Sequence, residues 1–115
     1  MNRLIIIGNL THDPSLRTLA DGTSVCDFDV AVNRRRGSEN VADFFRVTAW
    51  RALADNCARY LARGRKVCVV GSVTCRAYEK RDGSPGAALE VQADSVEFLS
   101  PVGGGGRDDY DGGEA

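Results

Sequence analysis

The sequence has few of the residues that metal sites and nucleophilic catalysis need. It contains one histidine, His12, and its four cysteines form no Cys-x-x-Cys pair, so the spacing of a zinc or redox motif is missing. It also lacks a Gly-x-Ser-x-Gly elbow and a phosphate-binding glycine loop. Asp27 and Asp29 share one strand face without further ligands, and we interpret them as solvated acids. We therefore predict no catalytic residue, no metal and no cofactor.

Long apolar runs are absent as well. Near the N-terminus only residues 4–7 are continuously apolar, too few for a signal-peptide core or a membrane span. We therefore expect a cytoplasmic protein. Three of the four cysteines fall in strand-like stretches, where cysteine commonly behaves as a small buried hydrophobe, and we expect this of all four: Cys26, Cys57, Cys68 and Cys75.

What is present suits one small domain with an uneven charge. A chain of 115 residues, 43% of them hydrophobic, has room for a single core, which excludes a two-domain enzyme. Residues 1–102 hold 14 of the 15 basic and 12 of the 16 acidic side chains, which leaves this part with a net charge of +2. All but two of the basic residues are arginine, the side chain suited to forked phosphate contacts. A nucleic acid partner is therefore compatible with the overall charge of −1.

The composition changes after Pro101. Residues 103–115 contain six of the 13 glycines, four acids and a single aromatic residue, Tyr110, with nothing to build a core. We predict a folded domain over residues 1–102 and a flexible, glycine-rich acidic tail over residues 103–115.

Within the domain, five segments have the apolar pattern of β-strands. They are residues 3–10, 24–33, 43–50, 66–78 and 87–99, separated by loops at 11–22, 34–40 and 79–86. Between the third and fourth strands we predict a helix with a stop at Gly64, and its buried face carries Leu53, Cys57, Tyr60 and Leu61. Five strands with a helix in this place is the order of an OB-fold, an all-β Greek-key barrel that often binds oligonucleotides.

Three details of the strands carry further expectations. Gly71 interrupts a valine-rich strand and predicts a bulge, and the apolar phase shifts near Asp94, which suggests a second irregularity. The first strand is apolar on both faces between Leu4 and Ile7, whereas a half-exposed strand would alternate. A second copy of the chain packed against this strand would explain that pattern.

The third strand gives the clearest functional signal. Period-2 alternation places Phe44, Arg46 and Trp50 on one face, and Arg76 and Tyr78 likewise share a face of the fourth strand. Aromatic rings on which bases stack, interleaved with cations that follow the phosphates, are what a single-strand binder needs. Burial of Phe44 and Trp50 is an equally good interpretation of the pattern alone. Basic loop residues flank this face, although such runs are often simply solvated: Arg34, Arg35, Arg36, Lys80 and Arg81.

Several stretches, in this order and spacing, resemble the bacterial single-stranded DNA-binding protein family. They are N-R-L-I-I-I-G-N-L at residues 2–10, D-P-S-L-R at 13–17, G-T-S-V at 22–25, A-V-N-R at 31–34, F-R-V-T-A-W-R at 45–51, A-R-Y-L-A-R-G at 58–64 and E-V-Q-A-D-S-V-E-F-L at 90–99. The resemblance implies an OB-fold homotetramer, not an enzyme, that binds single-stranded DNA during replication, recombination and repair.

The resemblance also implies site residues. Bases would stack on Phe44, Trp50 and Tyr78, and the flanking basic positions correspond to Arg3, Arg17, Arg46, Arg63 and Arg76. Apart from the resemblance, we also expect nucleic-acid contacts from Arg34, Arg35, Arg36 and Arg51. Arg36 stands near a position where many members carry a further stacking aromatic. In the family an acidic tail with a Pro and Phe tip recruits replication and repair proteins, whereas this sequence reads Asp-Gly-Gly-Glu-Ala at that place.

Two alternatives remain open at the level of sequence. One is an OB-fold interaction subunit that docks other proteins and binds nucleic acid weakly. The other is an RNA-binding OB-fold, because stacking does not separate ribose from deoxyribose and no residue is an evident reader of the 2′-hydroxyl.

Overall fold

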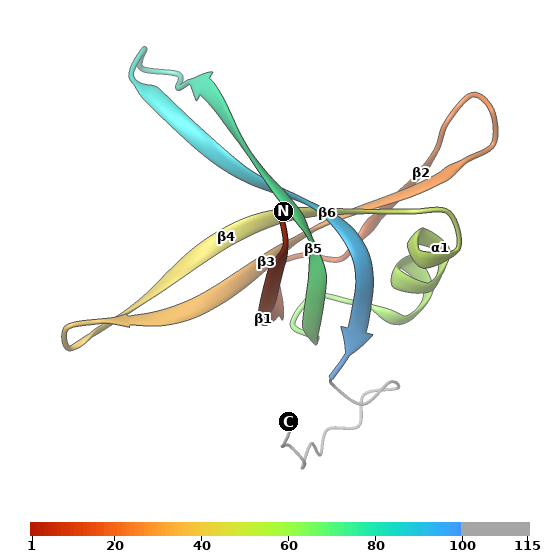
Figure 1. The fold of residues 1–115 in the computed structure, drawn as a ribbon, viewed down its shortest axis with the longest axis horizontal. Coiled ribbons are helices and arrows are strands. Elements are labelled where there is room, and N and C mark those ends of the chain that lie inside the picture. The colour runs from red at the N-terminus through yellow and green to blue at the C-terminus, as the bar shows by residue number, and fades with distance from the viewer. Residues whose placement is uncertain (100–115) are drawn as a thin grey trace.

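A computed structural model describes residues 1–99, which form six strands and one helix (Figure 1). The strands are β1 (Leu4–Leu10), β2 (Ser15–Thr18), β3 (Ser24–Arg36), β4 (Glu39–Trp50), β5 (Lys66–Glu79) and β6 (Pro85–Phe98), and the helix is α1 (Arg51–Tyr60). The expected tail at residues 103–115 and the domain boundary at residue 102 lie outside the described residues.

Five of the strands close into a barrel. The sheet order is β1-β5-β6-β4-β3-β2, and β1 pairs a second time, with β3, through Asn9 opposite Ala31 and Leu10 opposite Val30. The β4–β6 pair is parallel, whereas the other pairs are antiparallel. The predicted OB-fold with one helix between its third and fourth long strands is therefore confirmed.

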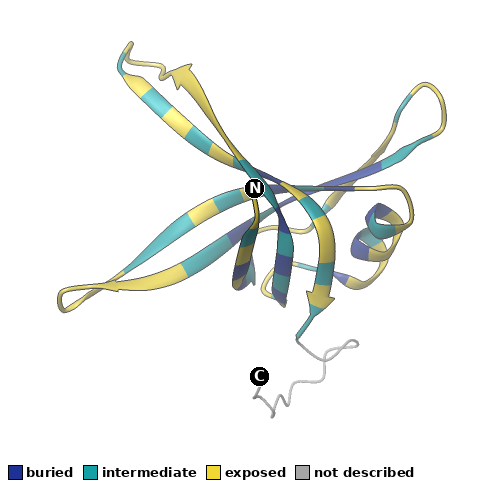
Figure 2. Cartoon of the chain, in the orientation of Figure 1, coloured by how far each residue is buried: buried dark blue, intermediate teal, exposed yellow. Residues whose placement is uncertain are grey.

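The core lies inside this barrel and beneath α1 (Figure 2). Branched aliphatic side chains from several strands are fully buried there: Val30, Val47, Val67, Val69 and Val91. Ala54 and Cys57 of α1 are buried against them, and Tyr60 packs at the edge of the helix, with its ring centroid 6.1 Å from that of Phe98. Within residues 1–99, no helix combines the length and apolar character that a membrane crossing needs.

The helix ends earlier than the sequence predicts. Leu61 has an extended backbone and caps α1 by donating its N–H to the carbonyl of Cys57, and Gly64 follows in the next turn with a φ of +88°. Gly64 is therefore a turn residue and not the helix stop.

The two predicted irregularities are the two sides of a single β-bulge. Val70 pairs with Ser95 and Gly71 pairs with Ala93, so Asp94 is the extra residue on β6. A Cβ atom on Gly71 would lie 2.1 Å from the carbonyl oxygen of Gln92, which explains why a side chain is missing there. The bulge bends β5 and β6, as barrel closure requires.

Two loop predictions are wrong. Ser15–Thr18, expected within a loop, forms β2 and pairs with the start of β3. The polar segment at residues 34–40 is also paired, because β3 runs to Arg36 and β4 begins at Glu39, with Gly37 at a φ of +62° in the turn. Residues 34–40 are polar on both faces and therefore lack the apolar alternation that marks a strand in the sequence. Backbone hydrogen bonds between β3 and β4 nevertheless hold this segment in a hairpin.

The β3–β4 and β5–β6 hairpins extend beyond the barrel as two arms that diverge in Figure 1. The outer ends of both arms are largely exposed (Figure 2). Cys75 lies on the β5–β6 arm and is exposed, and Cys68 is half-buried, so the expectation of buried cysteines holds only for Cys26 and Cys57.

Candidate nucleic-acid interface

The aromatic residues of the third long strand are exposed and not part of the core. Phe44 is 61% and Trp50 37% exposed, while their neighbours Val47 and Ala49 are fully buried. Alternation along β4 thus points these two rings outward, and the alternative of burial is excluded for both.

Tyr78 lies on the same side of the sheet. Arg46 of β4 pairs with Glu90 of β6, and Glu90 pairs in turn with Thr74 of β5. Because directly paired residues point to the same side of a sheet, the side that carries Arg46 also carries Thr74 and, by alternation, Arg76 and Tyr78. We call this side, with Phe44, Arg46, Trp50, Arg76 and Tyr78, the aromatic face.

The ring of Tyr78 is supported from two directions. A Cβ atom on Gly86, its cross-strand partner, would lie 2.8 Å from the ring carbon Cζ, so the ring rests against the glycine backbone. The guanidinium carbon of Arg76 lies 5.8 Å from the ring centroid, within the range of a cation–π contact. Tyr78 is still 42% exposed, which leaves ring surface for a base.

An open groove of about 550 Å³ separates the arms beside this face. Phe44 and Arg46 line it from β4, Ala88 and Leu89 line it from β6, and Asp29 contributes a carboxylate. An apolar wall with charged groups at its side suits a flat, polar-edged ligand such as a nucleobase.

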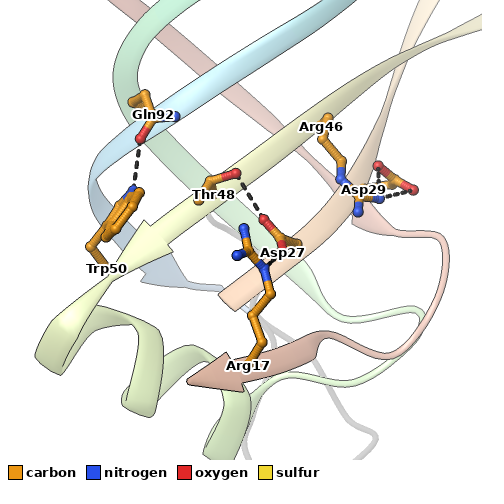
Figure 3. A network of polar contacts seen from close by, with 7 residues as sticks. All are labelled: Arg17, Asp27, Asp29, Arg46, Thr48, Trp50 and Gln92. Carbon is orange, nitrogen blue, oxygen red and sulfur yellow. Dashed lines mark hydrogen bonds and ion pairs between the residues drawn. The ribbon is translucent and has the colours of Figure 1, made fainter. Parts of the chain in front are cut away.

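The aromatic side of the sheet also carries a buried carboxylate that the sequence pattern predicts to be solvated. Asp27 is only 9% exposed, accepts a hydrogen bond of 2.8 Å from Nε of Arg17, and accepts another of 2.9 Å from Oγ1 of Thr48 (Figure 3). Burial disfavours its charge, but the bonds from Arg17 and Thr48 and the nearby positive charges outweigh burial and lower the pKa of Asp27. Its interpretation as a solvated acid is wrong, because β2 brings Arg17 over it.

Four of the predicted basic residues form ion pairs. Nη1 of Arg46 lies 3.3 Å from both carboxylate oxygens of Asp29 (Figure 3). In the other three pairs, Nε of the arginine contacts one carboxylate oxygen at 2.6–2.8 Å: Arg17 with Asp27, Arg34 with Asp43 and Arg76 with Glu90. The sequence does not predict these pairings, because each acid is nine or more residues from its arginine. Asp27 and Asp29 are in addition expected to be solvated.

The other predicted cations are distributed over several elements. Arg35 and Arg36 are exposed on the β3–β4 arm, and Arg63 lies in the turn after α1, where Asp13 accepts a hydrogen bond from its backbone N–H. Arg3 precedes β1, next to Asn2, whose side chain exchanges two hydrogen bonds with the backbone of Val73. Lys80 and Arg81 lie in the exposed turn of the β5–β6 arm.

Arg51 follows Trp50 with an unusual backbone. Its φ is +59°, and it is the one non-glycine residue with a positive φ in the described part of the chain. Arginine rarely adopts this conformation, so the turn from β4 into α1 stores strain next to an exposed aromatic ring.

The side-chain types that commonly bind metal ions are scattered within residues 1–99. Within residues 1–99 there is no group of three or more His, Cys, Asp or Glu side chains placed to hold a metal ion. The ring nitrogen Nδ1 of His12 is 2.8 Å from the hydroxyl of Thr11, in the turn after β1.

Comparison with known proteins places this geometry in a family. The Single-strand binding protein family matches residues 1–99. The chain is 44% identical over 110 residues to a protein named single-stranded DNA-binding protein in Bacillus cereus, covering 93% of this chain and 65% of that protein. It is 41% identical over 109 residues to single-stranded DNA-binding protein A of Bacillus subtilis, covering 92% of this chain and 63% of the relative.

A third relative, the single-stranded DNA-binding protein of Caldanaerobacter subterraneus, is 40% identical over 109 residues, covering 92% of this chain and 73% of the relative. The chain thus spans slightly less than two thirds of the length of the two Bacillus relatives. The match over all described residues, together with the barrel and its exposed aromatic face, shows that the chain belongs to the Single-strand binding protein family.

Proposed function

We propose that this chain binds single-stranded DNA without strong sequence preference and protects it during replication, recombination and repair. One observation carries the proposal: three exposed rings, Phe44, Trp50 and Tyr78, share a side of the sheet with Arg46 and Arg76. Every base has a flat face, so stacking on such rings tolerates any sequence, while the arginines neutralise phosphates. Family membership agrees with a binding protein rather than an enzyme.

In this proposal the strand crosses the aromatic face along the groove beside β4. Bases stack on the three rings, and phosphates are met by basic residues on the face and around it: Arg3, Arg17, Arg34, Arg35, Arg36, Arg46, Arg51, Arg63 and Arg76. Duplex DNA presents no free base faces to these rings, so we expect it to bind far more weakly.

The first test is a titration with a long oligo-dT and with a duplex of equal length, following the fluorescence of Trp50, the only tryptophan in the chain. Strong quenching by the single strand alone supports the proposal. An unchanged signal with both ligands, together with no complex in a mobility assay, contradicts it and favours an interaction subunit. Repeating the titration with oligo-U tests the RNA-binding alternative.

We further propose a homotetramer whose subunits meet through β1. Ile5 and Ile7 point outward and are 63% and 53% exposed, and they pair across the sheet with Val70 and Cys68 of β5. An outward apolar strip on two neighbouring strands is costly in water, and a second copy of the chain would cover it.

The wider cellular role follows from the family and is also a proposal. We place the protein in the cytoplasm, where it would meet DNA and replication or repair proteins. Residues 103–115 hold four acids and one arginine, so removing them is expected to leave DNA binding intact or tighten it slightly. A large loss of affinity on truncation would contradict this.

A further inference from the structure

Three of the four ion pairs repeat one geometry. On the neighbouring antiparallel strand, the acid is not the residue directly opposite the arginine but the one two positions further along the chain. For example, Arg76 is opposite Ala88, and its ion-pair partner is Glu90. The acid is thus the diagonal neighbour, which a long side chain can reach. We call them the three Nε pairs: Arg17 with Asp27, Arg34 with Asp43 and Arg76 with Glu90.

The contacting atom is the same in all three. The carboxylate accepts from Nε, and within residues 1–99 these guanidinium groups donate no hydrogen bond through Nη1 or Nη2. The outer edge of a guanidinium, with its two parallel N–H groups, is the edge that binds a phosphate in a forked manner. The three arginine side chains are 52%, 52% and 57% exposed, so this edge is accessible.

Arg46 differs in both respects. Asp29 is paired directly opposite Arg46, and the contact uses Nη1, at the longer distance of 3.3 Å to each oxygen. In this pair the carboxylate occupies part of the phosphate-binding edge. Arg17 and Arg76 lie on the aromatic face with Arg46, whereas Arg34 and Asp43 lie on the opposite side of the sheet. The aromatic face thus contains two acids that contact an arginine at Nε and one acid that occupies the phosphate-binding edge of Arg46.

From this contrast we infer that Asp27, Asp43 and Glu90 are positioning residues for DNA binding: each fixes an arginine through Nε so that its Nη1 and Nη2 edge is presented to a phosphate. The inference rests on the proposed function. It runs against simple electrostatics, which predicts that every acid near a polyanion site weakens binding. A free arginine loses side-chain entropy when it binds a phosphate, and an arginine already held by an acid loses less. We expect this gain to outweigh the repulsion between the acid and the phosphate.

Glu90 offers a test in which charge is held constant. Glu90→Gln and Glu90→Met both remove one negative charge, but only glutamine keeps an oxygen that can accept from Nε of Arg76. We expect Glu90→Met to bind oligo-dT about three- to tenfold more weakly than Glu90→Gln, the fold-change that one oriented hydrogen bond commonly gives. The slope of affinity against salt should also be shallower for Glu90→Met by about 0.7, one phosphate contact.

Two comparisons separate positioning from a general structural effect. In an Arg76→Ala background the two Glu90 variants should bind equally, because no guanidinium remains to be oriented. Asp29→Leu, which leaves no oxygen at the outer edge of Arg46, should bind as tightly as the unmodified protein or more tightly. The pair Asp43→Asn and Asp43→Leu repeats the test on the other arm, so a folding defect in one variant does not decide the result.

Equal affinity of Glu90→Gln and Glu90→Met overturns the inference, and so does a difference that persists without Arg76. Binding of oligo-dT by the unmodified protein, measured in the same series, distinguishes failure of the positioning role from failure of the proposed function. If that binding is present and the variants are equal, the positioning role alone fails. If the unmodified protein does not bind, the proposed function fails as well.

Discussion

The indole N–H of Trp50 donates a hydrogen bond of 2.8 Å to Oε1 of Gln92, which joins the last residue of β4 to β6 (Figure 3). These strands are paired in parallel over only three residue pairs, from Arg46 opposite Glu90 to Thr48 opposite Gln92. The bond satisfies the one polar group of the ring and fixes the direction of its edge. The stacking platform is therefore already oriented in the free protein.

We predict that Trp50→Ala weakens binding of oligo-dT by about 1–3 kcal/mol, the usual contribution of one stacked base. Trp50→Phe keeps an aromatic face but cannot bond to Gln92, so it should lose less. Fluorescence anisotropy of a labelled oligonucleotide measures both variants, since the intrinsic signal is gone. An alanine variant that binds like the unmodified protein would remove Trp50 from the interface.

A second prediction concerns the strained residue beside this ring. Arg51 has a φ of +59°, which glycine adopts freely and other residues do not. Arg51→Gly should therefore be more stable than Arg51→Ala by about 1 kcal/mol, although alanine is the better helix former. Urea denaturation measures the difference.

DNA affinity provides the control for that comparison. Both Arg51 variants lose the same cation, so they should bind oligo-dT equally. If alanine proves the more stable replacement, the positive φ carries no strain in solution.

The aromatic face could be predicted from sequence because alternation survives wherever one side of a strand is buried. Phe44 and Trp50 stand out against buried Val47 and Ala49 in that way. The outer end of the β3–β4 arm could not be predicted, because residues 34–36 and 39–40 are polar on both sides of the hairpin. The role of Asp27 could not be predicted either, because the short segment Ser15–Thr18 has no apolar alternation that marks it as a strand, and the contact of Asp27 with Arg17 depends on that strand.

The buried carboxylate gives a pH prediction. Hydrogen bonds and positive charge lower the pKa of folded Asp27, so its stabilising contribution is present above the unfolded value of about 3.9 and is lost as the pH falls through the folded pKa. Asp27→Asn should reduce the free energy of unfolding at pH 7 by about 1.5–3 kcal/mol, the usual contribution of a hydrogen bond to a charged group. Urea denaturation at pH 7 and near pH 3 measures both effects.

The variant should also lose less stability than the unmodified protein between those two pH values. Asp55→Asn, an exposed change on α1 that removes the same charge, is the matched control. Parallel pH curves for Asp27→Asn and the unmodified protein would show that Asp27 does not titrate differently on folding.

Thiol reactivity follows from the positions of the cysteines. Burial raises the pKa of Cys57 to about 12 and that of Cys26 to about 11, and both side chains are inaccessible. At pH 8 a disulfide reagent should therefore react rapidly with exposed Cys75, and with Cys26 and Cys57 only after unfolding. Cys75→Ser should abolish the fastest phase. Rapid reaction of Cys57 in the native protein would mean that α1 opens readily.

The outward strip on β1 gives the last prediction. Ile7→Asp places a charge on this strip, so light scattering after gel filtration should show a smaller assembly than the unmodified protein forms. The subunit itself should still fold, because Ile7 is 53% exposed in it. Leu16→Asp is the matched control, since Leu16 is 48% exposed on β2, away from this strip, and should leave the mass unchanged.

Cys68 reports on the same surface, because it pairs with Ile7 across β1 and β5. If subunits meet there, Cys68 is covered in the assembly, and its reaction with a thiol reagent should be faster in Ile7→Asp than in Leu16→Asp. A lower mass together with faster labelling locates the interface on this strip. An unchanged mass for Ile7→Asp would place the contact elsewhere, since a buried charge at the centre of an apolar interface cannot leave that interface intact.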